Sequence, residues 1–111
     1  MDNLVQFLRA RFYEDTRLAV SARDPWFGYE PDQHVERVRE ADALHIARHS
    51  PKRILAEVDA KRALLTEYEE RAATSSPDLV DLGRLQGLEK AIRALTAPYA
   101  GHPDYRSEWR P

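Results

Sequence analysis

Cysteine is absent from the sequence, and glycine occurs only four times in 111 residues. Without cysteine the chain forms no disulfide, no thiolate metal site and no cysteine nucleophile, and such a composition is compatible with a reducing cytoplasm. Uninterrupted apolar runs extend over only a few residues, far below the ~20 that a membrane-spanning helix requires. The N-terminus has no basic start followed by an apolar stretch, so we expect no signal peptide. These absences predict a cytoplasmic protein without a membrane segment.

An excess of charge of one sign is also missing. The 17 basic and 19 acidic side chains give a net charge of −2, so general electrostatic attraction to nucleic acid is not expected and would require a local patch. Hydrophobic residues make up 42% of the chain and charged residues 32%, which is too apolar for a disordered chain and too polar for a membrane protein. The length fits a single domain over residues 1–111.

Three stretches show helical spacing of their apolar residues. The first covers 3–22, with Asn3 as the expected N-cap and Gln6 three positions later, as in a capping box. The second follows Ser50, a cap residue, and Pro51, a favoured first helical residue, and continues to 73. The third begins at 76–78 by the same cap-then-proline logic and reaches 96. These stretches predict a small bundle of three amphipathic helices.

Residues 33–49 are compatible with two structures. The spacing of Val35 and Val38 and the good helix formers that follow favour a helix. A short β-hairpin is the competing interpretation, with Val35 and Val38 in one strand, a turn near 41–42 and a return strand at 44–47. We therefore predict a mostly α fold, of the α+β class if the hairpin forms between the first two helices, with an all-α fold as the alternative.

Three segments together resemble a known family, namely residues 4–11, 45–62 and 99–111. They are similar to small proteins of unknown function from actinobacteria and their phages. The resemblance implies no activity. Relatives tend to have a glycine-containing turn near positions 40–43, which implies a hairpin, but this sequence lacks that glycine.

Two clusters of side chains suggest sites for ions. His45 and His49 are four residues apart and share a face if they lie on a helix, and with His34 they are the candidate metal ligands. Zincins have a glutamate directly after the first histidine, whereas Ile46 stands here, so ordinary surface or capping histidines are the favoured interpretation. The second cluster could contact phosphate or nucleic acid near a helix N-terminus, although acidic residues interleave with it. Its members are Arg48, Lys52, Arg53, Lys61 and Arg62.

Aromatic residues and two glycines remain to be explained. The aromatic candidates for partner binding lie outside the expected helices, and covering the core is their alternative role. They are Trp26, Phe27, Tyr29, Tyr105 and Trp109, the last two in an irregular C-terminal tail that we expect to pack back on the body. Gly83 and Gly87 are four apart in the third helix, and close approach by another element is the expected reason for them.

No catalytic motif is recognisable, neither a phosphate-binding glycine loop nor a nucleophile elbow. We therefore expect a non-enzymatic accessory protein without a cofactor, which acts by protein–protein contact or self-association. A nucleic-acid-binding regulator of a phage or mobile element is the alternative, and a metal-dependent enzyme is a weaker one.

Overall fold

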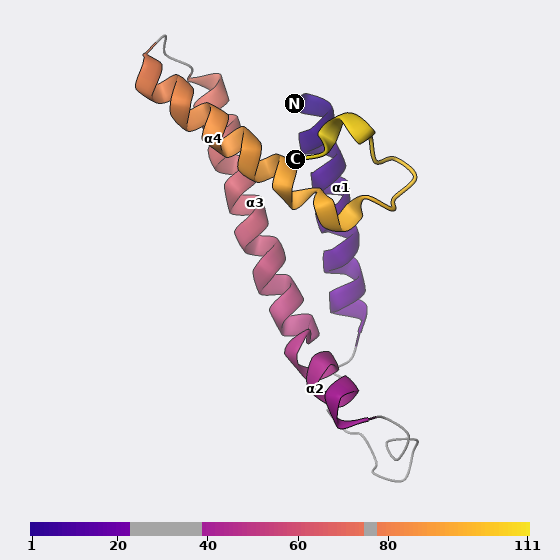
Figure 1. Ribbon diagram of the computed structural model, residues 1–111. Coiled ribbons are helices and arrows are strands. Elements are labelled where there is room, and N and C mark those ends of the chain that lie inside the picture. Colours follow the sequence, from indigo (N-terminus) through magenta and orange to yellow (C-terminus); the bar gives the residue numbers. More distant parts are fainter. Residues whose placement is uncertain (23–38, 75–77) are drawn as a thin grey trace.

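The structure, a computed structural model, describes residues 1–22, 39–74 and 78–111. Within these residues the chain forms four α-helices: α1 (Asp2–Ser21), α2 (Glu40–Arg48), α3 (Pro51–Ala73) and α4 (Leu79–Leu95). α1 and α3 lie side by side and run in opposite directions, and α4 returns along the C-terminal part of α3 (Figure 1). The expected mostly helical fold is confirmed, although the described part of the chain has four helices where the sequence indicated three.

The hydrophobic core forms where α1, α3 and α4 meet. Leu4, Leu8 and Phe12 recur every four residues of α1 and therefore share one face. They pack in one cluster with Leu65 of α3 and Ile92 of α4, and each of the five is at most 1% exposed. Burial of side chains of this size contributes about 1.5–3 kcal/mol each, so this cluster is the main source of stability.

The C-terminal tail packs back on α1, as expected. It contains two short 3-10 turns, at Ala97–Tyr99 and Ser107–Trp109. The Phe7 ring of α1 packs against the rings of Tyr99, Tyr105 and Trp109, with centroid distances of 6.3, 6.2 and 4.9 Å. The tail is thus held mainly by an aromatic cluster, which completes the core on the side of α1 that α3 does not cover.

The predicted β-hairpin is wrong at its return strand, because residues 44–47 belong to the helix α2. The first turn of α2 carries Glu40 and Asp42, whose negative charges favour a helix N-terminus. Arg39 donates to Asp42 at 3.1 Å across this turn, and alanines occupy three of the nine helical positions. Together with the missing turn glycine, these features favour the helix. Val35 and Val38, the other expected strand, lie outside the described residues.

The predicted caps are correct at only one of three helices. Ser50 caps α3 as predicted: its hydroxyl accepts the N–H of Arg53 at 3.4 Å, and Pro51 is the first helical residue. Asn3 was expected to cap α1, but the helix already begins at Asp2, and its N-cap Met1 makes no side-chain cap bond. The expected start of α4 at 76–78 is also corrected, because Asp78 is the N-cap and accepts the N–H of Val80 at 2.9 Å.

Gly83 and Gly87 of α4 do not mark a close approach in the described structure. A Cβ atom built on either residue meets no other atom within 4 Å. Both lie on the exposed face of α4. The expectation that another element packs against them is therefore wrong for the described part of the chain.

The molecule is elongated, with extents of 64 × 24 × 22 Å. The packed centre lies between two ends, one formed by α2 with the adjoining ends of α1 and α3, the other by the C-terminal end of α3 and the N-terminal end of α4 (Figure 1). Large apolar side chains are exposed at both ends. None of the helices in the described ranges combines the length and hydropathy needed to span a bilayer.

Candidate functional site

An apolar groove lies at one end of the molecule, between the C-terminal part of α1, α2 and the N-terminal part of α3. Its volume is about 470 Å³, within the range of roughly 300–1,000 Å³ found for ligand pockets. Leu18 and Ala19 of α1, Ile46 of α2, and Ile54 and Val58 of α3 supply its apolar surface. Carboxylates and a cation border it, so an apolar ligand surface with a few polar groups would fit best.

The direction change between α2 and α3 creates this groove. His49 ends α2 in a non-helical conformation, with φ −100° and ψ 40°, and Ser50 follows in an extended conformation. The cap bond from Ser50 and the ring of Pro51 then begin α3 immediately. As a result Ile46 and Ile54, eight residues apart in sequence, line the same groove from two different helices.

The helix α2 has few contacts of its own. It has nine residues, none of them buried, and Leu44 and Ile46 are 63% and 38% exposed. A helix shorter than about 12–15 residues is only marginally stable in isolation. Additional apolar contact at this end of the molecule would therefore stabilise α2 as well as cover the groove.

The two carboxylates at the border of the groove, Glu57 and Asp15, each accept a hydrogen bond from a neighbouring side chain. Arg53 Nε donates to Glu57 at 2.9 Å, and this hydrogen bond lowers the pKa of the Glu57 carboxyl, helped by the charges of Lys61 and His49. On the opposite wall Asp15 accepts a bond of 2.5 Å from the Tyr99 hydroxyl. Burial and this bond raise the pKa of Tyr99 above its ordinary value, so the phenol stays a donor.

The five predicted phosphate-binding residues do not converge on one point. Arg53 pairs with Glu57, and Arg62 binds the Thr16 hydroxyl at 3.2 Å and lies 3.8 Å from Asp59. Lys61 lines the groove, while Arg48 borders a separate shallow depression on α2. Lys52 is exposed on the first turn of α3. Two of the five predicted residues, Arg53 and Arg62, are therefore engaged in ion pairs within the chain.

The predicted histidine ligands form only a pair among the described residues. The rings of His45 and His49 lie 4.5 Å apart, centre to centre, as expected for positions four apart on a helix. In the described ranges no group of three or more His, Cys, Asp or Glu side chains has the spacing to hold a metal ion. The third candidate, His34, lies outside these ranges.

The predicted binding aromatics divide into two groups. Trp26, Phe27 and Tyr29 lie outside the described residues. Trp109 is buried in the core and Tyr105 packs at its edge, with their rings 5.9 Å apart. In this structure Trp109 and Tyr105 therefore hold the tail on α1 and do not form an exposed anchor.

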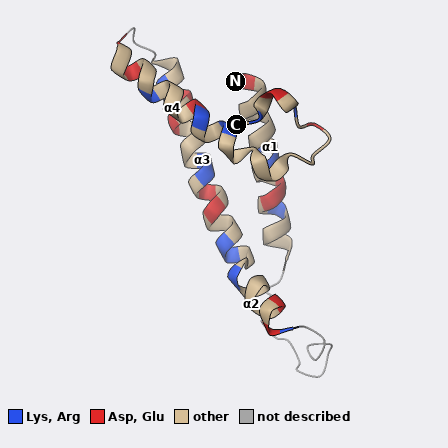
Figure 2. Cartoon of the chain, viewed as in Figure 1, with Lys and Arg blue, Asp and Glu red and all other residues tan. Residues whose placement is uncertain are grey.

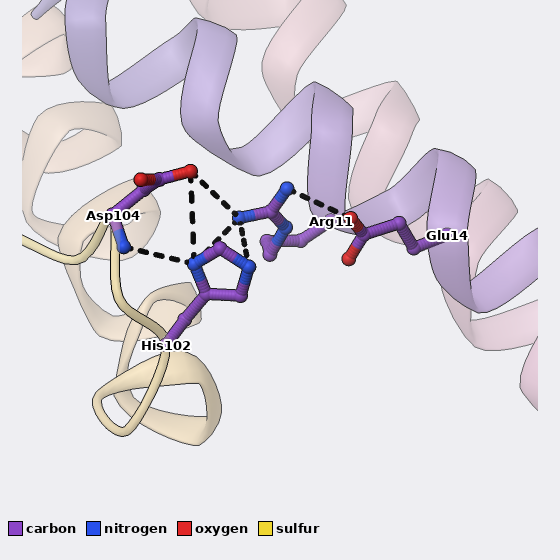
Figure 3. Close-up of polar contacts among 4 residues, drawn as sticks. All are labelled: Arg11, Glu14, His102 and Asp104. Carbon is purple, nitrogen blue, oxygen red and sulfur yellow. Dashed lines mark hydrogen bonds and ion pairs between the residues drawn. The ribbon is translucent and has the colours of Figure 1, made fainter.

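A polar cluster that was not predicted from the sequence joins the tail to α1 (Figure 3). Arg11 is only 7% exposed, and its Nη1 lies 2.6 and 2.8 Å from the two ring nitrogens of His102. Its Nη2 donates to Glu14 at 3.0 Å, and the guanidinium carbon lies 5.0 Å from the centre of the Phe7 ring. The backbone N–H of Asp104 donates to His102 Nδ1 at 3.0 Å. This cluster fixes residues 102–104 against α1 and has a structural role.

One signal for this cluster was present in the sequence. Arg11 stands four residues after Phe7 and three after Leu8, so it falls on the apolar face of α1. A charged residue in that position needs partners when it is buried. The partner His102 is 91 residues away along the chain, and no local pattern identifies it.

Comparison with protein families assigns the whole chain to one family. A family model described as "Family of unknown function (DUF6221)" matches residues 1–111, the whole chain. The chain belongs to this family. The resemblance to a family of unknown function is thereby confirmed, and membership in DUF6221 brings no assigned activity. Among the curated proteins and the solved structures, none matches this DUF6221 protein.

Proposed function

We propose that this chain is a non-enzymatic, cytoplasmic accessory protein that acts by protein–protein contact through the groove between α1, α2 and α3. The observation that carries the proposal is the groove itself, which has a volume of about 470 Å³ and lies beside large exposed apolar side chains. Leu18 on its α1 wall is 72% exposed. Binding sites are commonly concave, mostly apolar and bordered by a few polar groups, as this groove is.

The state of α2 supports the same function. A partner that packs on Ile46 would also cover part of a nine-residue helix that has no buried side chain. Since short helices gain most of their stability from tertiary packing, docking would stabilise α2 and fix the groove wall together. The nucleic-acid alternative has less support, because Arg53 and Arg62 are paired with carboxylates of the same helix.

Site-specific photocrosslinking tests this proposal. A benzophenone amino acid replaces Leu18, which lines the groove, or Val20, which does not line it and has nearly the same exposure, 70% against 72%. Each protein is irradiated alone and in host extract. We expect one defined adduct from position 18 and at least tenfold less of it from position 20.

Competition shows whether the adduct depends on the groove. Excess unlabelled wild-type protein should remove the adduct, whereas an unlabelled Leu18→Asp variant should not. Circular dichroism shows that both labelled proteins fold alike. No adduct, or equal adducts from both positions, would refute contact through the groove.

A further inference from the structure

Two histidines lie side by side at the C-terminal end of α2. The backbone N–H of His49 donates to the carbonyl of His45 at 3.0 Å, so the two residues are one helical turn apart. Their rings lie 4.5 Å apart, centre to centre, with an angle of 42° between the ring planes. Both side chains are exposed and line the same shallow depression on α2. The helix, which the sequence left open at this segment, therefore brings the two imidazoles together on one face.

The spacing of the two rings suits an ion that both of them bind. A metal–nitrogen bond to imidazole is about 2.0–2.1 Å long, so two nitrogens that bind one ion lie about 3 Å apart. Within the described residues neither ring takes part in a side-chain hydrogen bond. Rotation about the side-chain bonds of these exposed residues can therefore bring one nitrogen of each ring to the ion without breaking another contact of this kind.

The ligands available favour a divalent transition metal. Imidazole nitrogens bind Cu²⁺, Ni²⁺ and Zn²⁺, whereas Ca²⁺ and Mg²⁺ prefer oxygen ligands. In the part of the chain that the structure describes, no third His, Cys, Asp or Glu joins the pair, while a closed zinc site usually has four protein ligands. Water can fill the other positions around Cu²⁺ or Ni²⁺. Since a given set of ligands binds Cu²⁺ more tightly than its neighbours in the series, Cu²⁺ is the ion that fits best.

The charges around the pair do not attract a cation by themselves. Arg48 lines the same depression, and Figure 2 shows basic residues at the α2 end of α3. Arg53 among them is paired with Glu57 at 2.9 Å, and the Glu57 carboxylate also interacts electrostatically with His49. Part of the positive charge is thus balanced, but none of it favours a metal ion. Binding of an ion here therefore depends on chelation by both rings.

We propose that His45 and His49 form a two-imidazole site for a divalent transition-metal ion, with Cu²⁺ bound most tightly, and that the bound ion stabilises α2. This helix has nine residues and no buried side chain, so its own packing holds it only weakly. An ion that binds both rings binds the helical form better than the unfolded form, and such a ligand shifts the equilibrium toward the helix. His45 does not line the groove, so the inference does not depend on what binds there.

Isothermal titration of the untagged full chain with Cu²⁺ and Ni²⁺ tests the site. His45→Ala and His49→Ala should each weaken binding at least tenfold. The matched control combines His49→Ala with Ala47→His, which keeps the number of histidines but sets the pair two residues apart, on different faces of the helix. This variant should bind as weakly as His49→Ala alone, and His34→Ala should bind like the wild type. Circular dichroism shows that the variants fold alike.

Two spectroscopic measurements locate the ion and its effect. Substoichiometric Cu²⁺ should broaden the NMR ring signals of His45 and His49, whereas those of His102, which packs against Phe7, should stay sharp. Saturating Zn²⁺, which is diamagnetic, should slow amide hydrogen exchange in α2 at least tenfold in the wild type and leave it unchanged in the matched control.

The outcomes that overturn the inference are distinct. If the matched control binds as tightly as the wild type, or if all histidines broaden alike, binding is adventitious and the site is wrong. A tenfold loss of affinity in His34→Ala refutes a site made of two residues. Binding by both rings without slower exchange in α2 refutes the stabilisation of this helix.

Discussion

Replacing Gly87 with alanine should stabilise this protein. Gly87 lies in the interior of α4, and an added Cβ would meet no atom within 4 Å. Glycine is less favourable than alanine in a helix interior by about 0.8–1.0 kcal/mol, because it loses more backbone entropy on folding. With no steric cost to offset this gain, the free energy of unfolding should rise by about 1 kcal/mol.

The expected change in melting temperature follows from the length of the chain. Unfolding entropy near 60 °C is about 2.1 cal/mol/K per residue, or about 0.23 kcal/mol/K for a chain of this size. A gain of 1 kcal/mol therefore raises the melting temperature by about 4 °C in a circular dichroism melt. Gly83→Ala should act similarly, and Ala91→Gly, on the exposed part of the same helix, should lower it by a similar amount. Destabilisation by Gly87→Ala would show that another element or a partner covers this face.

Other substitutions test the capping, the core and the ionisation of the half-buried Tyr99 phenol. Ser50→Ala should cost about 1 kcal/mol in urea unfolding, whereas Asn3→Ala should cost only a few tenths, because Asn3 is not the cap of α1; equal losses would contradict these assignments. Trp109→Ala should cost about 3–5 kcal/mol, measured the same way, since its ring is buried against α1, and a loss below 1 kcal/mol would contradict its place in the core. Burial and the bond to Asp15 raise the pKa of Tyr99 above 10.0, so its contribution is fully present below about pH 10 and is lost as the pH rises further. Urea unfolding at pH 8 and pH 11 should therefore show a smaller alkaline loss in Tyr99→Phe than in the wild type, and equal losses would refute the link.

The helix α3 was predictable because its signals are local. Ser50 and Pro51 are adjacent in the sequence, and the cap bond joins Ser50 to Arg53, three residues away. The end of the helix at Ala73 was predicted equally well. Where sequence neighbours decide the structure, the pattern alone was sufficient.

The segment that became α2 was harder because its preferences are weak in either direction. Nine residues give little periodicity, and the resemblance to relatives with a turn glycine favoured a hairpin. The acidic first turn and the ion pair of Arg39 with Asp42 both favour a helix, but the prediction did not use them. The predicted cap of α1 failed for another reason: the helix begins one residue before Asn3, at Asp2, whose negative charge favours a helix N-terminus.

The groove and the polar cluster were not predictable from patterns in a single sequence. Leu18, Ile46 and Ile54 come from three helices, and only the packing of α1 against α3 brings them together. Arg11 and His102 meet because the aromatic tail returns to α1. The sequence shows which residues are apolar or charged, but only the tertiary fold brings these side chains together.

The separation of a packed centre from two exposed ends has a consequence for binding. The core cluster and the tail lie between the ends, so that exposed side chains of the groove such as Leu18 can change without loss of the core. The end that we propose to bind a partner nevertheless includes α2, and ordering backbone on docking costs about 1–2 kcal/mol per residue. The ion pair of Arg39 with Asp42 holds the first turn of α2, and the bond from Ser50 holds the adjoining start of α3, before any partner arrives. Since this order is already present, less of the docking energy is spent on folding α2, and the exposed Ile46 is available at the groove from the start.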